Sequence, residues 1–109
     1  MRRAARVDDN QAEIVVGLRK IGASVTPIHQ VGNGCPDLAV GYRGRTVLFE
    51  LKDPKQPLSK RKLTDDEAIW FGSWRGEAYV IETIEQAIEY LTRPRAGVME
   101  VSDGSKQEA

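Results

Sequence analysis

The sequence feature that most constrains the fold is a pair of strand-forming runs, residues 37–42 and 45–52, separated only by Arg43 and Gly44. Two such runs joined by two residues that include a glycine are typical of a β-hairpin with a tight turn. If Arg43 and Gly44 form the turn, Tyr42 opposes Arg45, and all other pairs follow. The turn therefore predicts the register of both strands.

This register gathers charged side chains at the open end of the hairpin. It places Asp37 opposite Glu50. Because successive side chains of a strand point to opposite faces, Lys52 shares the face of Glu50. The other face is apolar and consists of Leu38, Val40, Val47, Phe49 and Leu51. We therefore expect two carboxylates and one amine to meet on one side of a sheet.

Helices and further strands are predicted around this hairpin. An apolar stripe before Gly22 predicts a first helix, capped by one of the polar residues at positions 8–10: Ile14, Val15, Leu18 and Ile21. Residues 24–30 suit at best a short edge strand, because Pro27 cannot donate to a ladder. Residues 77–82 predict a further strand.

Two capping boxes, S/T-x-x-E/Q, each predict the start of a helix. Thr64 and Glu67 open a helix that we expect to end at Gly76, with one side buried through Ile69, Trp70 and Trp74. Thr83 and Gln86 open a helix that Pro94 ends, with an apolar stripe formed by Ile84, Ala87, Ile88 and Leu91. The expected fold is α/β, with a mixed central sheet flanked by helices.

Length and composition narrow the classes of protein. A chain of 109 residues suits one domain, with a core over about residues 9–93 and a flexible tail over 96–109. The single cysteine, Cys35, excludes an internal disulfide, and with His29 as the only histidine a Cys/His zinc site lacks ligands. No apolar run approaches a membrane span, so we expect a soluble, cytoplasmic protein.

The net charge of zero hides a segregation of charge. Residues 1–62 carry twelve basic and six acidic side chains, whereas residues 63–109 carry four basic and ten acidic ones. A basic half hints at a polyanionic partner, although such blocks are often simply solvated surface.

The facing acids Asp37 and Glu50 allow two interpretations. Like charges opposite each other destabilise a sheet, and a divalent cation such as Mg²⁺ would compensate. Alternatively, both acids are solvated and Lys52 neutralises one of them. The glycine-bearing loop at Gly34 lets a phosphate or backbone approach, and a basic segment suited to phosphates follows, which favours a phosphodiesterase: Lys52, Lys55, Lys60, Arg61 and Lys62.

These motifs carry a family resemblance. Residues 34–38 (GCPDL), 50–52 (ELK), 58–59 (LS) and 63–64 (LT), ahead of an aromatic helix, resemble the VRR-NUC branch of the PD-(D/E)XK nuclease superfamily. The resemblance covers about residues 9–92 and implies a restriction-endonuclease-like αβββαβ core. It also implies endonucleolytic cleavage of DNA with Mg²⁺, or Mn²⁺ in its place. Small stand-alone members, often from phages, resemble Holliday-junction resolvases and act as homodimers on branched DNA.

The resemblance also implies roles for individual residues. Asp37 and Glu50 would be metal ligands, helped by the backbone carbonyl of Leu51 and by Glu13 from the first helix. Lys52 would position or activate the attacking water and offset the charge that develops on the phosphate. Where the family usually has Gln, this chain has Glu67; its capping box accounts for it, and we leave it off the core site.

Other readings stay open at this point. His29 is a weaker candidate base, Cys35 lacks a dedicated basic partner, and Phe71 is a candidate contact for nucleic-acid bases. Arg2, Arg3 and Arg6 are candidate phosphate contacts or part of a disordered start. The leading hypothesis is a metal-dependent endonuclease of branched DNA. The alternatives are a nuclease of the same fold acting on linear duplex DNA or RNA, and a non-catalytic nucleic-acid-binding module.

Overall fold

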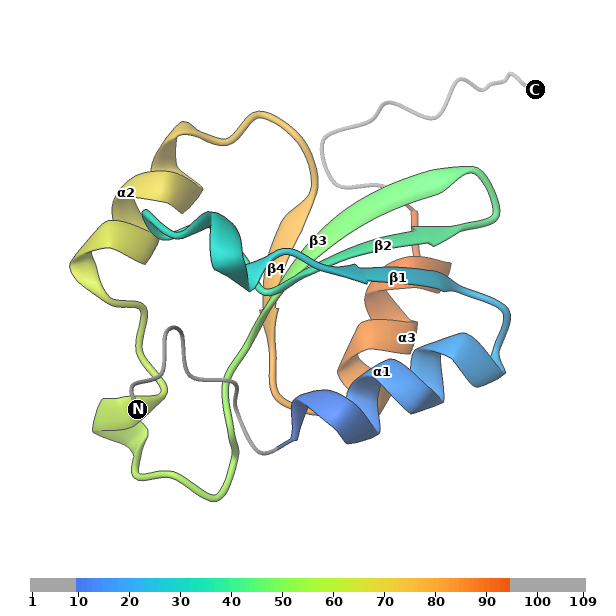
Figure 1. The fold of residues 1–109 in the computed structure, drawn as a ribbon, viewed down its shortest axis with the longest axis horizontal. Coiled ribbons are helices and arrows are strands. Elements are labelled where there is room, and N and C mark those ends of the chain that lie inside the picture. Colours follow the sequence, from blue (N-terminus) through green and yellow to red (C-terminus); the bar gives the residue numbers. More distant parts are fainter. Residues whose placement is uncertain (1–9, 95–109) are drawn as a thin grey trace.

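A computed structural model describes residues 10–94 as a four-stranded sheet with three α-helices (Figure 1). Along the chain the elements are α1 (Gln11–Lys20), β1 (Ser24–Pro27), η1 (His29–Val31, a 3₁₀ turn), β2 (Leu38–Tyr42), β3 (Arg45–Leu51), η2 (Leu58–Lys60, a 3₁₀ turn), α2 (Asp65–Ser73), β4 (Ala78–Ile81) and α3 (Ile84–Thr92). The predicted α/β class with a mixed sheet is confirmed. The predictions for residues 1–9 and for the tail at 96–109 lie outside the described residues.

The sheet has the order β1-β2-β3-β4, with antiparallel pairs except for the parallel pair β3-β4. The hairpin register is as predicted, since Leu38 lies opposite Phe49 and Tyr42 opposite Arg45. Arg43 and Gly44 both have positive φ angles, 52° and 79°, as a type I′ turn requires. The turn chemistry and the strand pattern thus agree.

The hydrophobic core lies between one face of the sheet and helices α1 and α3, which cover that face together (Figure 1). All five residues predicted for the apolar face of the hairpin are buried there. Ile14, Val15 and Leu18 contribute from α1 as predicted, but Ile21 follows the end of the helix and is exposed. Ala87 and Leu91 contribute from α3, whose capping box is present as predicted.

The prediction that α2 buries one side was wrong. The capping box of Thr64 and Glu67 is present, but α2 ends at Ser73, ahead of Gly76, and none of its residues is buried. Ile69 is 71% exposed and Trp74 is 43% exposed. Trp74 lies beyond the last helical residue and stacks on Trp70, with ring centroids 4.7 Å apart. The helix lies at one side of the molecule, away from the layer of α1 and α3 (Figure 1).

The predicted edge strand is confirmed but is shorter than residues 24–30. β1 ends at Pro27, which lacks the N–H needed to extend the ladder, and His29 begins the 3₁₀ turn η1 instead. None of the helices between residues 10 and 94 has the length and apolar character needed to cross a membrane.

Candidate functional site

The structure brings the predicted acids and amine together at the open end of the hairpin. Asp37 immediately precedes β2, Glu50 lies in β3, and Lys52 follows β3. The backbone N–H of Leu51 donates to Asp37 Oδ2 over 2.8 Å, which fixes the Asp37 carboxylate against β3. Glu50 is only 4% exposed and Lys52 only 9%. Both ionisable groups are therefore buried, and the interpretation of freely solvated acids does not describe Glu50.

Lys52 is held by two carboxylates. Its Nζ lies 3.5 Å from Oε2 of Glu50 and 2.9 Å from Oε1 of Glu67. Burial acts to lower the pKa of Lys52, but the hydrogen bond to Glu67 and the negative charge of Glu50 outweigh it and raise the pKa. Lys52 therefore stays protonated around neutral pH.

The carboxyl group of Glu50 has a strongly perturbed pKa. Burial, followed by the negative charges of Asp37 and Glu67, raises the pKa of Glu50 to about 9, although Lys52 opposes the shift. The pKa of the Cys35 thiol is raised by burial and then by the negative charges of Glu50 and Asp37. Negative charge is thus concentrated here, beyond what Lys52 alone offsets.

Glu67 is the residue of this cluster that sequence reasoning set aside. Its capping role is real, because Thr64 N–H donates to Glu67 Oε1 over 2.9 Å and Glu67 N–H donates to Thr64 Oγ1. The same Oε1 accepts the hydrogen bond of Lys52. Its hydrogen bonds from the Thr64 backbone and from Lys52 overcome the effect of burial and lower the pKa of Glu67. The family that these motifs resemble usually has Gln at this position. That difference was the sequence signal that could have placed Glu67 in the cluster.

The loop before Asp37 brings α2 up to the site. Gly34 has a φ of +82°, and a Cβ atom there would lie 2.3 Å from the backbone oxygen of Asp66. Only a glycine permits this approach, because any side chain would collide with the first turn of α2. In this structure, the absence of a side chain at Gly34 thus lets the backbone next to Glu67 come close.

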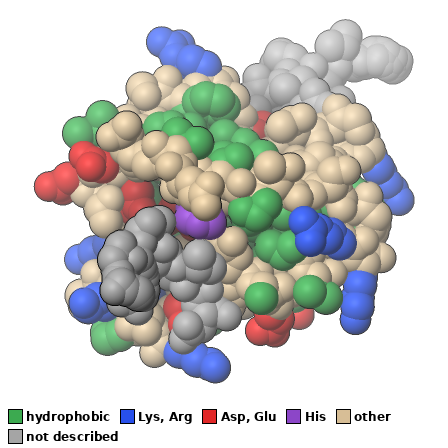
Figure 2. Space-filling view, viewed as in Figure 1, with side chains coloured by type: hydrophobic (Ala, Val, Ile, Leu, Met, Phe, Trp, Pro, Cys, Tyr) green, Lys and Arg blue, Asp and Glu red, His purple; other side chains and the backbone are tan. Residues whose placement is uncertain are grey.

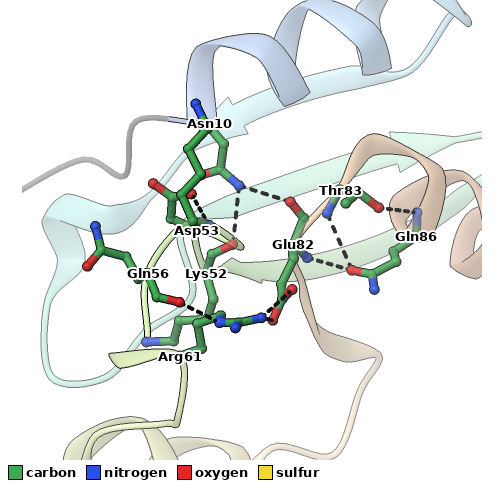
Figure 3. Close-up of polar contacts among 9 residues, drawn as sticks. Asn10, Lys52, Asp53, Gln56, Arg61, Glu82, Thr83 and Gln86 are labelled. Carbon is green, nitrogen blue, oxygen red and sulfur yellow. Dashed lines mark hydrogen bonds and ion pairs between the residues drawn. The ribbon is translucent and has the colours of Figure 1, made fainter. Parts of the chain in front are cut away.

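Glu13 is the predicted site residue on the first helix. It is exposed on α1 and lines a cavity of about 310 Å³ whose lining residues include neither Asp37 nor Glu50. The charged residues around this cavity are Glu13, Asp53, Lys55, Glu82 and Glu85. Asn10 borders the same cavity, and its side-chain amide donates to the backbone oxygens of Lys52 and Glu82 (Figure 3). Asn10 thereby ties the start of α1 to the ends of β3 and β4.

The predicted basic segment divides into exposed and engaged cations. Lys55, Lys60 and Lys62 are exposed. Arg61 instead donates to the backbone oxygen of Gln56 and pairs with Glu82, so that it holds the loop after β3 against the end of β4 (Figure 3). The three lysines are the cations of this segment that face solvent.

The ion pairs also resolve how the two oppositely charged halves of the chain are arranged. Arg45 pairs with Glu77, Lys52 with Glu67, and Arg61 with Glu82. Each of these three pairs joins a cation from residues 1–62 to an acid from residues 63–109, whereas the contact of Lys52 with Glu50 lies within residues 1–62. The basic and acidic halves are thus interleaved by folding, and the polyanion-binding hypothesis depends on local groups.

Within residues 10–94, no three or more His, Cys, Asp or Glu side chains form a group that could hold a metal ion. Comparison of the chain with protein-family models, curated proteins and solved structures finds no match.

Proposed function

We propose that this protein is a metal-dependent endonuclease that hydrolyses phosphodiester bonds in branched DNA, such as four-way junctions. The observation that carries the proposal is the cluster of Asp37, Glu50 and Lys52 at the open end of the hairpin, in which Glu50 and Lys52 are buried and Asp37 is half-buried. Burying like charges costs free energy unless something compensates for it, so such a cluster is more typical of a functional site than of a structural one. The family resemblance of the same residues supplies the reaction class.

The donor set suits a hard divalent cation. Two carboxylates together in a partly buried place are ligands that Mg²⁺ takes along with water and phosphate oxygens. Mg²⁺ would displace the proton that the raised pKa of Glu50 keeps on this group in the absence of metal. Asp37, Glu50 and the backbone carbonyl of Leu51 would hold the metal. When bound, it would polarise the phosphate and lower the pKa of a water molecule. Glu13 is proposed as a fourth metal ligand only because of the family resemblance.

The environment of Lys52 limits what this side chain does in the proposed reaction. Its raised pKa makes it a cation near neutral pH and a poor general base. Lys52 therefore stabilises negative charge that develops on the phosphate, and Glu67 orients the ammonium group through the 2.9 Å hydrogen bond. The exposed lysines Lys55, Lys60 and Lys62 would contact the DNA backbone.

A cleavage assay tests the activity directly. End-labelled four-way junction, flap, linear duplex and single-stranded DNA, and RNA, are incubated with Mg²⁺, Mn²⁺ or chelator. We expect metal-dependent cuts in the junction, lost in Lys52→Ala by a factor of about 100 or more. Lys62→Ala is the matched control, because it removes an exposed lysine and should leave cleavage at saturating DNA largely intact. Cleavage of only linear DNA or only RNA would mean that the substrate class is not branched DNA. Binding of DNA without cleavage under every metal would overturn the proposed enzymatic activity.

A stability measurement tests the metal site without relying on activity. If Asp37 and Glu50 bind Mg²⁺ together, adding Mg²⁺ should raise the Tm of the wild type, and Asp37→Asn should remove that rise. In chelator near neutral pH, Asp37→Asn should raise the Tm, because it removes one of the charges that force Glu50 to take up a proton in the folded state. A Tm that is insensitive to Mg²⁺ and Mn²⁺ in the wild type would sink the metal assignment.

A further inference from the structure

The cavity beside the first turn of α1 is lined mainly by acids among its charged residues. It has a volume of about 310 Å³ and lies between the start of α1, the loop after β3 and the junction of β4 with α3. Figure 2 shows acidic side chains at the surface at the lower edge of the molecule, where Figure 1 places α1. We call it the acidic cavity, and its charged lining residues are four acids and one lysine: Glu13, Asp53, Glu82, Glu85 and Lys55.

The charges around the acidic cavity do not balance. Arg61, which is not part of the lining, pairs with Glu82. Lys55 forms no ion pair with any acid among residues 10–94. Setting these two cations against the four carboxylates of the lining leaves an excess of two negative charges. An occupant with two positive charges would therefore neutralise the cavity.

Two oxygen atoms of the lining lack hydrogen-bond donors. Asp53 is only 7% exposed, and its Oδ1 accepts the backbone N–H of Lys55 over 2.9 Å, but its Oδ2 has no partner among the described residues. Asn10 Oδ1 is buried and also lacks a partner there, although the amide nitrogen of the same side chain donates to the backbone oxygens of Lys52 and Glu82 (Figure 3). Because buried acceptors without a donor are costly, these two oxygens indicate a ligand that brings N–H groups.

We propose that the acidic cavity binds a short linear diamine through its two ammonium groups. An ammonium group carries one positive charge and three N–H donors, which matches both the excess of negative charge and the oxygens that lack donors. The cavity also has apolar side chains for the carbon chain to contact: Ile14, Pro54 and Ile84. Its lining includes none of Asp37, Glu50 and Lys52, so the proposal holds whether or not the protein cleaves DNA.

Metal ions and anions suit the acidic cavity less well. Within residues 10–94 no group of three or more acids, His or Cys is arranged to hold a metal ion. The start of α3 and Lys55 would attract an anion. However, Thr83 and Gln86 already cap this helix, and Glu85 places a carboxylate in its first turn. The excess of carboxylates would then repel a phosphate.

Isothermal titration calorimetry of the full chain with 1,4-diaminobutane tests the site, at low ionic strength in cacodylate buffer, which contains no amine. We expect one diamine to bind per chain. The control 1-aminobutane has the same carbon chain but one ammonium group, and it should bind about tenfold more weakly. Inorganic phosphate should not bind. Undetectable binding of the diamine, equal affinity for the two amines, or tighter binding of phosphate would each overturn the proposal.

Two substitutions at the cavity should change the affinity for 1,4-diaminobutane in opposite directions. Asp53→Asn keeps an acceptor for the Lys55 N–H but removes a negative charge, so it should weaken binding by about tenfold. Lys55→Ala removes a competing cation and should strengthen binding, a gain that a misfolded variant would not show. The matched control Glu89→Gln removes an exposed carboxylate of α3 outside the cavity and should bind like the wild type.

The same titrations can contradict the assignment. Equal weakening by Asp53→Asn and Glu89→Gln would mean that the diamine follows only the net charge of the protein. Weaker binding by Lys55→Ala, or wild-type affinity in Asp53→Asn, would place the diamine outside the acidic cavity.

Discussion

Lys52 Nζ donates a 2.9 Å hydrogen bond to the same oxygen, Glu67 Oε1, that closes the capping box of α2. One carboxylate oxygen thus belongs both to the start of a helix and to the buried charge cluster. The consequence is that the first turn of α2 and the position of Lys52 depend on each other.

Replacing Glu67 should therefore affect the site more than the loss of a cap explains. Glu67→Ala removes the acceptor for Lys52 and one bond of the capping box, at a cost of about 1 kcal/mol in the free energy of unfolding. Gln86→Ala is the matched control, because Gln86 holds the same capping position in α3 without touching Lys52. Urea unfolding should show similar losses for both variants, whereas only Glu67→Ala should slow DNA cleavage. Equal cleavage by the two variants would mean that Glu67 only caps the helix and does not act on the site.

The raised pKa of Glu50 predicts how stability depends on pH in chelator. The folded state binds a proton at Glu50 up to about pH 9, whereas the unfolded chain releases it near the ordinary value of 4.5. The free energy of unfolding should therefore fall as pH rises from about 4.5 to about 9, and flatten above this range.

Glu50→Gln should remove this slope. One unit of pKa difference corresponds to about 1.4 kcal/mol, so the variant should exceed the wild type by at least about 1 kcal/mol at pH 8. Glu85→Gln, which removes an exposed carboxylate on α3, is the control and should keep the slope of the wild type. Urea unfolding at several pH values measures all three proteins. A wild-type stability that rises between pH 5 and pH 8 would contradict the assignment.

Gly34 should tolerate substitution far less than a glycine of the same conformation elsewhere. Gly34→Ala would force a Cβ atom against the Asp66 backbone and should cost about 3 kcal/mol. Gly44 has a similar φ of +79° but open space around it, so Gly44→Ala should cost only about 1–2 kcal/mol. Urea unfolding gives the losses, and tryptophan fluorescence reports α2 through Trp70. Equal losses would mean that the contact with α2 is not a tight one.

The ion pair of Arg45 and Glu77, with side chains 9% and 14% exposed, should matter more than that of Arg61 and Glu82, with side chains 24% and 29% exposed. Arg45 also donates to the backbone oxygens of Leu91 and Arg93, which fixes the end of α3. Arg45→Met should cost about 3 kcal/mol, since it removes the ion pair with Glu77 together with both of these backbone hydrogen bonds. Arg61→Met, in a pair that solvent screens, should cost about 1 kcal/mol or less. Chemical denaturation that ranks the two in the reverse order would refute this.

Local sequence signals predicted the hairpin and both capping boxes, because their determinants lie within a few residues of one another. The register followed from the Arg43-Gly44 turn, and it correctly brought Asp37, Glu50 and Lys52 to one place. Strand alternation then separated the buried apolar face from the charged one.

Such local signals could not predict how α2 packs or which residue it adds to the cluster. Helical spacing of Trp70 and Trp74 indicated an apolar side, but spacing does not show whether another layer of the fold covers it. Glu67 was fully accounted for by its local cap, and its second hydrogen bond reaches Lys52 across the fold. That bond is a tertiary contact, which depends on how Gly34 lets the helix approach.

The scarcity of buried side chains in α2 has a consequence for the order in which the molecule opens. Elements fixed mainly by polar contacts exchange their amide hydrogens through local unfolding, well before a packed sheet opens. The amides of α2 should therefore exchange faster than those of β2 and β3, and each opening releases Lys52 from Glu67 while the core stays intact. The contact between Lys52 and Glu67 would thus be made and broken by the folding of nine residues.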